Sequence, residues 1–396
     1  MRVLFVVPTD YDAVVKKGVA WLIDQREEDG ELEQVITVHP FAINERSIAH
    51  SPRQTVYEFR TPAPSAWRIV GWLRLLGHIL RTALRIRALA RSNQVDIVRA
   101  QDPYYSALLA WLATRFTRAR LVISLHADYR QRYRLDGAQG APEVFGSRAL
   151  AELLERVMLR QADGVLPIRE SLGRQAMEAG VPAARIHLIP HGINLAAFAA
   201  DAGDDDVPLD ALQLDDSRAW LVFGGRLSRE NYVADMLEMG EQLSRQRDDF
   251  LLVLAGDGPE RAALSARLEV TPQLSRCCRL VGPVAAPVMA SLRRHAAVGI
   301  VLMGGLSLIE ACAAGRPVCA YDVEWHHELV ENGVTGYLVE EADIASLATR
   351  VAQLLDDPTA ADAMGAAARK RAFTRHSEAA ARGARMAAYR AVAGAG

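Results

Sequence analysis

The sequence predicts an α/β protein of two domains, each built around a parallel sheet. The chain has 396 residues, which is too long for one compact core and suits two domains of roughly 100–200 residues each. Short apolar runs alternate with longer helical patterns, which is typical of βαβ units. A run rich in Gly, Asp and Pro at 201–208 separates two such halves.

The first half contains apolar runs that we expect to form strands. The run 3–7 ends at Pro8-Thr9-Asp10, and a helix is expected to open near Lys17-Gly18. The later runs are 35–38, 96–98, 121–125, 164–167 and 186–190. Because they are short and apolar on both faces, they predict strands covered by helices on both sides.

The second half repeats this alternation. Its expected strands are 219–223, 250–254, 278–281, 298–302, 317–321 and 336–339. The tail is an Ala- and Arg-rich helix with no strand left to pair, so we expect it to pack back onto the first domain. The predicted domains are 1–192 and 193–375, followed by the helix 376–396. The aspartates of 201–208 can be read as a metal-binding cluster or as a solvated acidic loop, and their linker composition favours the loop.

Composition restricts the class of protein. Lys plus Arg (46) nearly balance Asp plus Glu (48), so we expect no nucleic-acid partner. The four cysteines lack metal-ligand spacing, which favours a reducing, cytoplasmic compartment and no zinc. The N-terminal apolar run is too short for a signal peptide, and no apolar stretch reaches the length of about 18 residues that a membrane span needs.

The segment 67–91 has two interpretations. Basic residues recur there at helical spacing, opposite apolar ones: Arg74, His78, Arg81 and Arg85 against Leu73, Leu76, Ile79, Leu80 and Leu84. The first interpretation is a surface helix packed on the sheet. The second is a basic amphipathic face that makes peripheral contact with an anionic membrane, at the inner face of the cytoplasmic membrane.

Candidate sites come from the loops that follow strands, because ligands bind at the carboxyl ends of parallel strands. Four such loops are rich in glycine or charge: 8–18, Gly224-Gly225-Arg226, Gly256-Asp257-Gly258-Pro259 and Gly304-Gly305-Leu306-Ser307. None fits the dinucleotide or P-loop patterns. In the second loop, a phosphate can approach the backbone while the Arg226 guanidinium binds it in a bidentate manner. The third loop is by itself a tight turn.

In chain order, these pieces form a larger pattern. It runs through Ile189-Pro190-His191-Gly192, Gly224-Gly225-Arg226-Leu227, Gly256-Asp257-Gly258-Pro259, Val281-Gly282-Pro283-Val284, Glu310-Ala311 and Glu328 to Gly336. This pattern resembles the retaining glycosyltransferases of family 4 (group 1), which have the GT-B fold. The resemblance implies two Rossmann-like domains facing across a cleft. It also implies a nucleotide-sugar donor on the C-terminal domain, an acceptor on the N-terminal domain, and no cofactor besides the donor.

The resemblance assigns roles to individual residues. Arg226, beside Gly225, would bind the donor diphosphate, and Glu310 would bind the ribose hydroxyls. The base would meet Gly282, Pro283 and Val284, and the sugar and phosphate would meet Gly304, Gly305, Leu306 and Ser307. His126 would be the active-site histidine, although a histidine after a strand can also be structural. Lys17 and Gly18 lie where the family has a glycine-rich loop, but the usual glycine pair is absent.

Three departures from the family pattern stand out. Asn231 occupies the position where the family has a lysine, so Arg229, or Lys16 and Lys17, would have to supply that charge. Leu302 replaces the first glutamate of the two-glutamate motif, which excludes a carboxylate nucleophile at that position. Met303-Gly304-Gly305 replaces Gly-Phe-Gly, and Trp325-His326-His327 is expected to form a wall of an altered sugar pocket.

The expected function is glycosyl transfer with retained configuration to a glycan, lipid-linked or small-molecule acceptor. No metal is needed if arginine and backbone dipoles neutralise the leaving group. The missing lysine and glutamate also suit a CMP-activated acidic sugar. A non-catalytic nucleotide- or glycan-binding relative and, with less support, a nucleotide-sugar epimerase are further alternatives.

Overall fold

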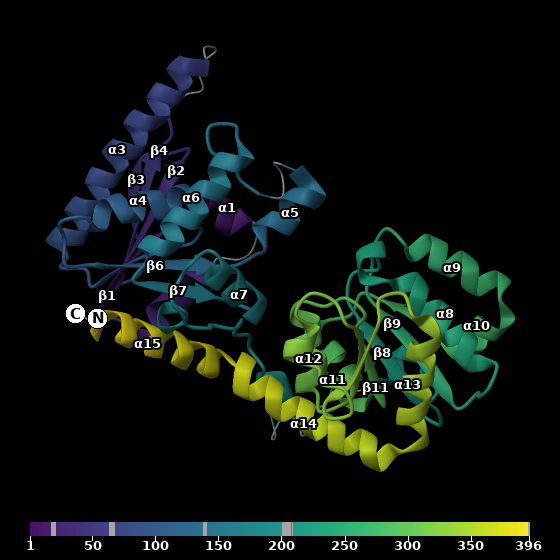
Figure 1. Cartoon of the computed structure of the whole chain (residues 1–396). Coiled ribbons are helices and arrows are strands. Elements are labelled where there is room, and N and C mark those ends of the chain that lie inside the picture. Colours follow the sequence, from purple (N-terminus) through teal and green to yellow (C-terminus); the bar gives the residue numbers. More distant parts are fainter. Residues whose placement is uncertain (17–20, 63–67, 138–140, 200–206, 208, 395–396) are drawn as a thin grey trace. The chain divides into compact units, whose positions relative to one another are not determined.

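The computed structural model describes residues 1–16, 21–62, 68–137, 141–199, 207 and 209–394. The chain divides into two compact units (Figure 1). Unit 1 comprises Met1–Pro190 and Arg382–Gly396, and unit 2 comprises His191–Ala381. Each unit contains one mainly parallel sheet with helices on both faces, so the predicted α/β fold class is confirmed.

The sheet of unit 1 has seven strands in the order β3-β4-β2-β1-β5-β6-β7. All neighbours pair in parallel except β3 and β4, which are antiparallel. The strands are β1 (Arg2–Val6), β2 (Gln34–Ala42), β3 (Arg46–Ala49), β4 (Gln54–Arg60), β5 (Ile97–Ala100), β6 (Arg120–Leu125) and β7 (Gly164–Pro167).

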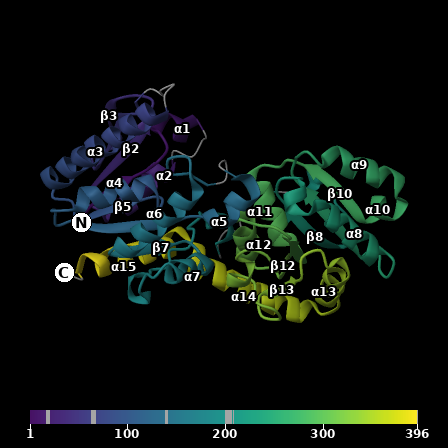
Figure 2. The same ribbon diagram turned by 45° about the horizontal axis from the view of Figure 1, so that its top comes forward.

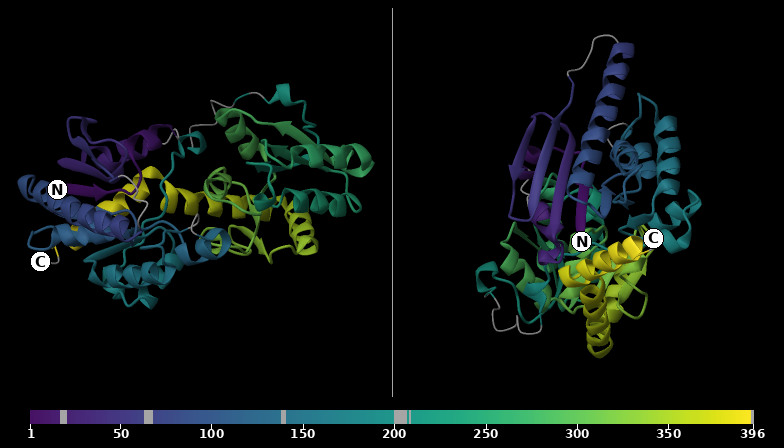
Figure 3. Two further views of the ribbon diagram at one scale, coloured as in Figure 1. Left: turned by 90° about the horizontal axis from the view of Figure 1, so that it is seen from above. Right: turned by 90° about the vertical axis from the view of Figure 1, so that its left-hand side faces the viewer.

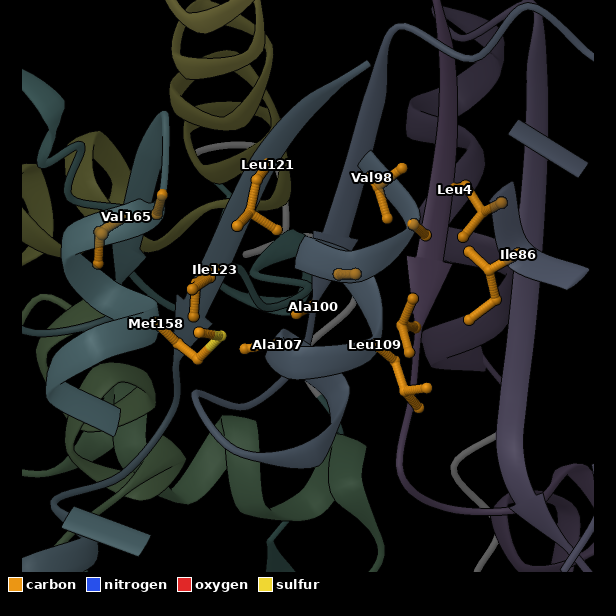
Figure 4. Close-up of a cluster of buried hydrophobic side chains, with 14 of the residues drawn as sticks. Leu4, Ile86, Val98, Ala100, Ala107, Leu109, Leu121, Ile123, Met158 and Val165 are labelled. Atoms are coloured by element: carbon orange, nitrogen blue, oxygen red, sulfur yellow. The ribbon is translucent and has the colours of Figure 1, made fainter. Parts of the chain in front are cut away.

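The helices of unit 1 connect these strands. They are α1 (Tyr11–Lys16), α2 (Trp21–Asp24), α3 (Arg68–Ser92), α4 (Tyr105–Thr114), α5 (Tyr129–Asp136), α6 (Arg148–Gln161) and α7 (Glu170–Glu178), with a 3₁₀ turn at Gln25–Gly30. Helices α3, α4 and α6 pack on one face of the sheet (Figure 4). There Ile86, Leu109 and Met158 meet the strand residues Val98 and Ile123 in a continuous apolar core.

The C-terminal helix α15 (Glu378–Gly394) covers the other face of the same sheet. Its buried Tyr389 accepts a hydrogen bond of 2.6 Å from Arg99 of β5, and Arg99 also donates to Ser124 of β6 (2.8 Å). Arg385 makes a bidentate ion pair with Glu28 at 2.7 and 2.8 Å. The last turns of the chain therefore belong to unit 1, as expected from a tail without a strand to pair.

The sheet of unit 2 has six parallel strands in the order β10-β9-β8-β11-β12-β13. Figure 2 labels β8, β10, β12 and β13 among them. The strands are β8 (Ala219–Gly224), β9 (Phe250–Ala255), β10 (Cys278–Gly282), β11 (Val298–Ile300), β12 (Val318–Tyr321) and β13 (Gly336–Val339).

Helices cover both faces of this second sheet. One face carries α8 (Val233–Ser244), α9 (Arg261–Val270), α10 (Pro272–Cys277) and α13 (Ile344–Asp356). The other face carries α11 (Ala286–His295), α12 (Leu306–Ala313) and α14 (Pro358–His376). Because the strands of this unit are buried on both faces, their sequences are continuous apolar runs.

In unit 1, one predicted strand is wrong and two observed strands were not predicted. The run 186–190 is not a strand, although His187 N donates to Val165 O and Ile189 N donates to Pro167 O of β7. Proline has no N–H group, so Pro167 cannot return a bond and the ladder stops. The sequence analysis also missed β3 and β4, the two strands at one edge of the sheet.

Helix α3 packs by a different face from the one that its leucines suggest. Ile79, Ala83 and Ile86 are buried in the core, and His78 is buried with Nε2 2.7 Å from the carbonyl oxygen of Pro40. Four of the leucine and isoleucine residues expected to pack are exposed instead: Leu73, Leu76, Leu80 and Leu84. No helix among the described residues is long and apolar enough to cross a membrane.

Two buried histidines make stability depend on pH. Burial lowers the pKa of His39, in unit 1, and of His376, in unit 2, to about 4 from 6.5. Below pH 6.5 these two histidines bind protons in the unfolded chain but stay neutral in the folded chain. The free energy of unfolding therefore falls with pH until the pKa of the folded state is reached. Each histidine contributes a loss of about 2–3 kcal/mol over that range.

We therefore expect the melting temperature to fall between pH 6.5 and pH 4, as followed by circular dichroism. Since glutamine stays neutral, His39→Gln and His376→Gln should each flatten this fall. An identical pH slope in the unaltered protein and both variants would contradict the assignment.

Candidate active site

The strand order of unit 2 creates a switch point between β8 and β11. From β8 the chain passes to β9 on one side, and after β10 it crosses to β11 on the other side. At such a point the loops after the two central strands diverge and leave room for a ligand at their carboxyl ends. Here those loops contain Gly225-Arg226 after β8 and Gly304-Gly305 after β11.

The loop after β8 is held in place by its backbone. Gly225 N donates to Ala255 O (3.0 Å), and Leu227 N donates to Asp257 O (2.9 Å). Gly256 N in turn donates to Gly282 O (2.8 Å), so the loops after β8, β9 and β10 are joined together. Gly256 has a φ of +148°, and a Cβ at this position would overlap the carbonyl oxygen of Gly225. The glycines after β9 thus permit close backbone packing.

Arg226 is the cation that this loop presents to solvent. Its side chain is exposed and forms no ion pair within 4 Å and no side-chain hydrogen bond with the residues that the structure describes, although Glu230 is near enough to interact with it electrostatically. Asn231, which stands where a second cation was expected, donates through Nδ2 to the carbonyl oxygen of Arg226 (2.7 Å). Arg229 is exposed, and its Nε lies 3.6 Å from Oε1 of Glu260. Asn231 therefore stabilises the loop without adding charge, and Arg226 is available for an anion.

Glu310 is linked to the same loop by a residue that the sequence analysis missed. Arg293 of α11 is buried, forms an ion pair through Nη1 with Glu310 Oε2, and donates through Nη2 to the carbonyl oxygen of Gly224 (3.3 Å). One guanidinium thus fixes both the carboxylate of α12 and the end of β8. In the sequence Arg293 is the first of three basic residues that end this helix, a pattern normally read as a solvated helix C-terminus, so it gave no signal for this role.

A buried histidine holds the loop before α12 in place. Gly304 N donates to Nε2 of His326 (3.1 Å), whose Nδ1 lies 2.8 Å from the carbonyl oxygen of Tyr321. Burial lowers the pKa of His326, which keeps the ring neutral and able to accept this bond. Gly305 and Leu306 are exposed at the N-terminus of α12, where backbone N–H groups favour an anion.

The expected pocket wall is only partly present. Trp325 and His326 are buried, and of the three residues of that loop only His327 is exposed. Leu302 is also fully buried, in the core with Ile300, so a donor cannot contact it.

The segment predicted to meet the base follows β10. Gly282 has a φ of +76° and accepts the bond from Gly256 described above. Pro283 is exposed, whereas Val284 packs partly against the core. The loops after β10, β8 and β11 therefore lie at one edge of the sheet, which brings together the predicted donor-binding residues of unit 2.

In unit 1, His126 lies just past the carboxyl end of β6. Its Nε2 is 2.7 Å from Oε1 of Gln101, which follows the neighbouring strand β5. Strand β5 and its neighbour β1 form the switch point of this sheet. The candidates Lys17 and Gly18, in the loop region after β1, lie outside the described residues.

Two family models match the chain. Residues 209–371 match the model described as glycosyl transferases group 1, and residues 43–197 match the model described as glycosyltransferase family 4. The first match falls in unit 2, and the second covers most of unit 1 and ends seven residues into unit 2. This chain belongs to the family 4 glycosyltransferases.

Known members of this kind match over most of their length. A glycogen synthase of Mycobacterium tuberculosis is 28% identical over 314 residues, which are 76% of this chain and 71% of that protein. An alpha-D-kanosaminyltransferase of Streptomyces kanamyceticus is 26% identical over 368 residues, 85% of this chain and 89% of that protein. The crystal structure of Anabaena Alr3699/HepE in complex with UDP has a TM-score of 0.68 at 16% identity and covers 98% of each chain. That likeness establishes the GT-B fold.

As a family 4 glycosyltransferase, the protein is a retaining enzyme that transfers a sugar from a nucleotide-sugar. The edge of the sheet in unit 2 has the chemistry that such a donor requires. It offers an exposed guanidinium and free helix N–H groups for phosphate, and a carboxylate that can accept hydrogen bonds from hydroxyls.

Proposed function

We propose that this family 4 glycosyltransferase binds a nucleoside-diphosphate sugar at the β8–β11 edge of unit 2. From there it transfers the sugar, without a metal ion, to a hydroxyl group of a glycan, lipid-linked or small-molecule acceptor. The observation that carries the proposal is the arrangement around Arg293: it fixes Glu310 beside the loop from which Arg226 extends without a partner among the described residues.

Each residue has a separate task in this proposal. Arg226 and the N–H groups of Gly305 and Leu306 bind the diphosphate and stabilise the charge that it gains as it leaves. Glu310 accepts hydrogen bonds from the ribose hydroxyls. The bond from the anomeric carbon to the diphosphate oxygen breaks, and the acceptor oxygen bonds to the anomeric carbon on the same face. The acceptor proton passes to the departing phosphate, which explains retention without a carboxylate at position 302.

We assign the acceptor to unit 1, with His126 positioned by Gln101 at the carboxyl edge of its sheet. We also place the enzyme in the cytoplasm, because its four cysteines are buried free thiols.

A CMP-activated acidic sugar is a second candidate donor. Two observations favour it: Leu302 is buried, and the side chain of Asn231 is engaged with the backbone. Asn231 leaves the site one positive charge fewer for a diphosphate than the family pattern provides, and Leu302 leaves one carboxylate fewer to repel an acidic sugar. The UDP complex of the Anabaena protein supports the diphosphate instead.

A thermal-shift series with UDP-, GDP- and CMP-sugars separates the two donors. A ligand that binds only the folded state at about 100 times its Kd raises stability by about 2.7 kcal/mol, which is a shift of several degrees for a domain of this size. We expect a shift with one nucleoside-diphosphate sugar and none with CMP-sugars. A shift with CMP-sugars alone would favour the second candidate, and no shift with any sugar nucleotide would contradict the proposed site.

A further inference from the structure

The outward face of α3 is apolar and uncovered by the residues that the structure describes. The exposed leucines are spaced by three or four positions, so they form one stripe along the helix: Leu73, Leu76, Leu80 and Leu84. Their exposed fractions lie between 46% and 64%. Since Ile79 and Ile86 on an adjacent face are buried in the core, α3 has two apolar faces, of which only one is packed.

Phe116 extends this stripe beside the last turn of α3. Its carbonyl oxygen accepts a bond of 2.8 Å from Arg91, and the Arg87 guanidinium lies 5.7 Å from its ring centroid. The side chain is 84% exposed, and its φ of +65° is in the left-handed region, which bulky residues seldom adopt. The chain thus presents a large apolar side chain to solvent at some cost in backbone energy.

The charge that the helix itself carries has one sign. Helix α3 contains six arginines and no acidic residue. Arg74 and Arg81 are exposed and form no ion pair with any part of the chain that the structure describes, whereas Arg85 is paired with Glu45 (2.6 Å). In Figures 1 and 3, α3 lies at the outside of unit 1 and its first turns extend beyond the sheet. An apolar stripe flanked by unpaired arginines therefore lies on the outside of this unit.

The positive charge of α3 favours an anionic bilayer over a second copy of the chain as the partner of this face. In a dimer of two α3 helices, arginines would face arginines with no carboxylate on either helix, and that repulsion opposes a second copy of the chain. An anionic bilayer fits both features, because acyl chains accept leucine and phenylalanine while lipid phosphates attract arginine. Trp72, 41% exposed near the start of the helix, is a residue type that membrane interfaces favour.

We propose that α3 and Phe116 form a docking surface by which unit 1 binds the surface of an anionic membrane. The helix lies parallel to the bilayer, with its leucines at the boundary of the acyl chains and with Arg74 and Arg81 among the lipid phosphates. Binding is peripheral and reversible, and added salt weakens it because exposed charges are screened.

Docking also narrows the class of acceptor, and this part rests on the proposed function. For a transferase bound to the bilayer, the effective concentration of acceptors carried in the same membrane is raised. The acceptor class that docking favours is a sugar or hydroxyl group carried by a lipid.

Vesicle flotation of the full chain tests the docking surface. We expect binding to vesicles of phosphatidylcholine with phosphatidylglycerol, and binding at least about tenfold weaker to phosphatidylcholine alone or in high salt. The variant Leu73→Ser/Leu80→Ser/Leu84→Ser should bind at least about tenfold more weakly to the anionic vesicles. The variant Arg74→Ala/Arg81→Ala should lose most of the preference for anionic lipid.

Matched controls come from unit 2. Val270→Ser, at a residue 79% exposed, and Arg245→Ala/Arg276→Ala, at two exposed arginines, should bind like the unaltered chain. All the substituted side chains are at least partly solvent-exposed, so circular dichroism and melting temperature should show each variant folded. Vesicle binding that is absent in the unaltered chain, or undiminished in the leucine variant, would overturn the proposal. So would a dimer, detected by analytical ultracentrifugation, that the leucine variant dissociates while no vesicle binding is seen.

The assay is independent of the proposed function, because it requires neither donor nor acceptor. Thermal shift by sugar nucleotides reports the donor site, and the leucine variant should retain it in full. If the chain does not bind vesicles but sugar nucleotides still raise its melting temperature, only the docking surface is refuted. If it binds vesicles but no sugar nucleotide raises its melting temperature, only the donor site is refuted.

Discussion

Replacing Arg226 by alanine should lower kcat/KM for sugar transfer by about 100-fold or more. This side chain is exposed, is not engaged by the described residues, and extends from a loop that the neighbouring strands fix. Removing a preorganised group that stabilises developing negative charge costs about 10²–10³ in rate. The melting temperature should stay nearly unchanged, because the described chain loses no hydrogen bond and only an exposed electrostatic interaction with Glu230. Steady-state kinetics and donor titration measure the two effects.

The variant Arg226→Lys refines this test. Lysine keeps the charge but not the planar fork, so we expect only partial recovery of transfer. Arg245→Ala, at an exposed arginine of α8's C-terminal end, is the control and should transfer normally. Transfer by Arg226→Ala within about twofold of the unaltered enzyme, with donor affinity retained, would contradict the assignment of the diphosphate to this loop.

Replacing Gly256 by alanine should both destabilise unit 2 and impair donor binding. The backbone at Gly256 has a φ of +148°, and a methyl group there would overlap the carbonyl oxygen of Gly225. The loop after β8 cannot retreat freely, because Gly225 N is bonded to Ala255 O. We expect a loss of about 2–4 kcal/mol in the free energy of unfolding. Denaturant titration measures this loss, and donor titration at low temperature measures the displacement of the loop.

Gly383→Ala is the matched control for this substitution. Gly383 lies in α15, where an added Cβ meets no atom within 4 Å. Alanine should be neutral or slightly stabilising there because it is the better helix former. If Gly256→Ala were as stable as Gly383→Ala and bound the donor normally, glycine would not be required for the packing of the two loops.

The strands of unit 2 could be predicted from the sequence because they are buried on both faces. A run such as 250–254 is apolar throughout, so it stands out from its surroundings. Strand β4 has the sequence QTVYEFR, in which polar and apolar residues alternate irregularly, and its partner β3 is largely exposed. Strand β3 is at the edge of the sheet and β4 is next to it, and neither provides a continuous apolar run, which is why the analysis missed them.

The packed face of α3 could not be chosen from the sequence. The leucines form one apolar stripe on this helix and Ile79, Ala83 and Ile86 form another, and periodicity alone does not decide between them. The sheet instead accepts Ile79, Ala83 and Ile86, and the leucines remain outside. Patterning identifies an amphipathic or apolar helix, but only the shape of the partner surface decides which stripe it buries.

The residues of the candidate site that lie in strand-to-helix loops could be predicted from the sequence. The residues that hold those loops in place could not. Glycines and Arg226 directly after β8 have a recognised pattern. Arg293 and His326 lie outside such loops, yet one bonds to Glu310 and Gly224 and the other to Gly304. These pairings join segments that are remote in sequence, so only the folded structure reveals them.

The most direct test of the central claim is a crystal structure of the full chain with UDP bound. The account predicts a diphosphate within hydrogen-bonding distance of the Arg226 guanidinium and of the N–H groups at the start of α12, with ribose hydroxyls on Glu310. A nucleotide bound elsewhere, with Arg226 still facing solvent and Glu310 still paired only with Arg293, would contradict it.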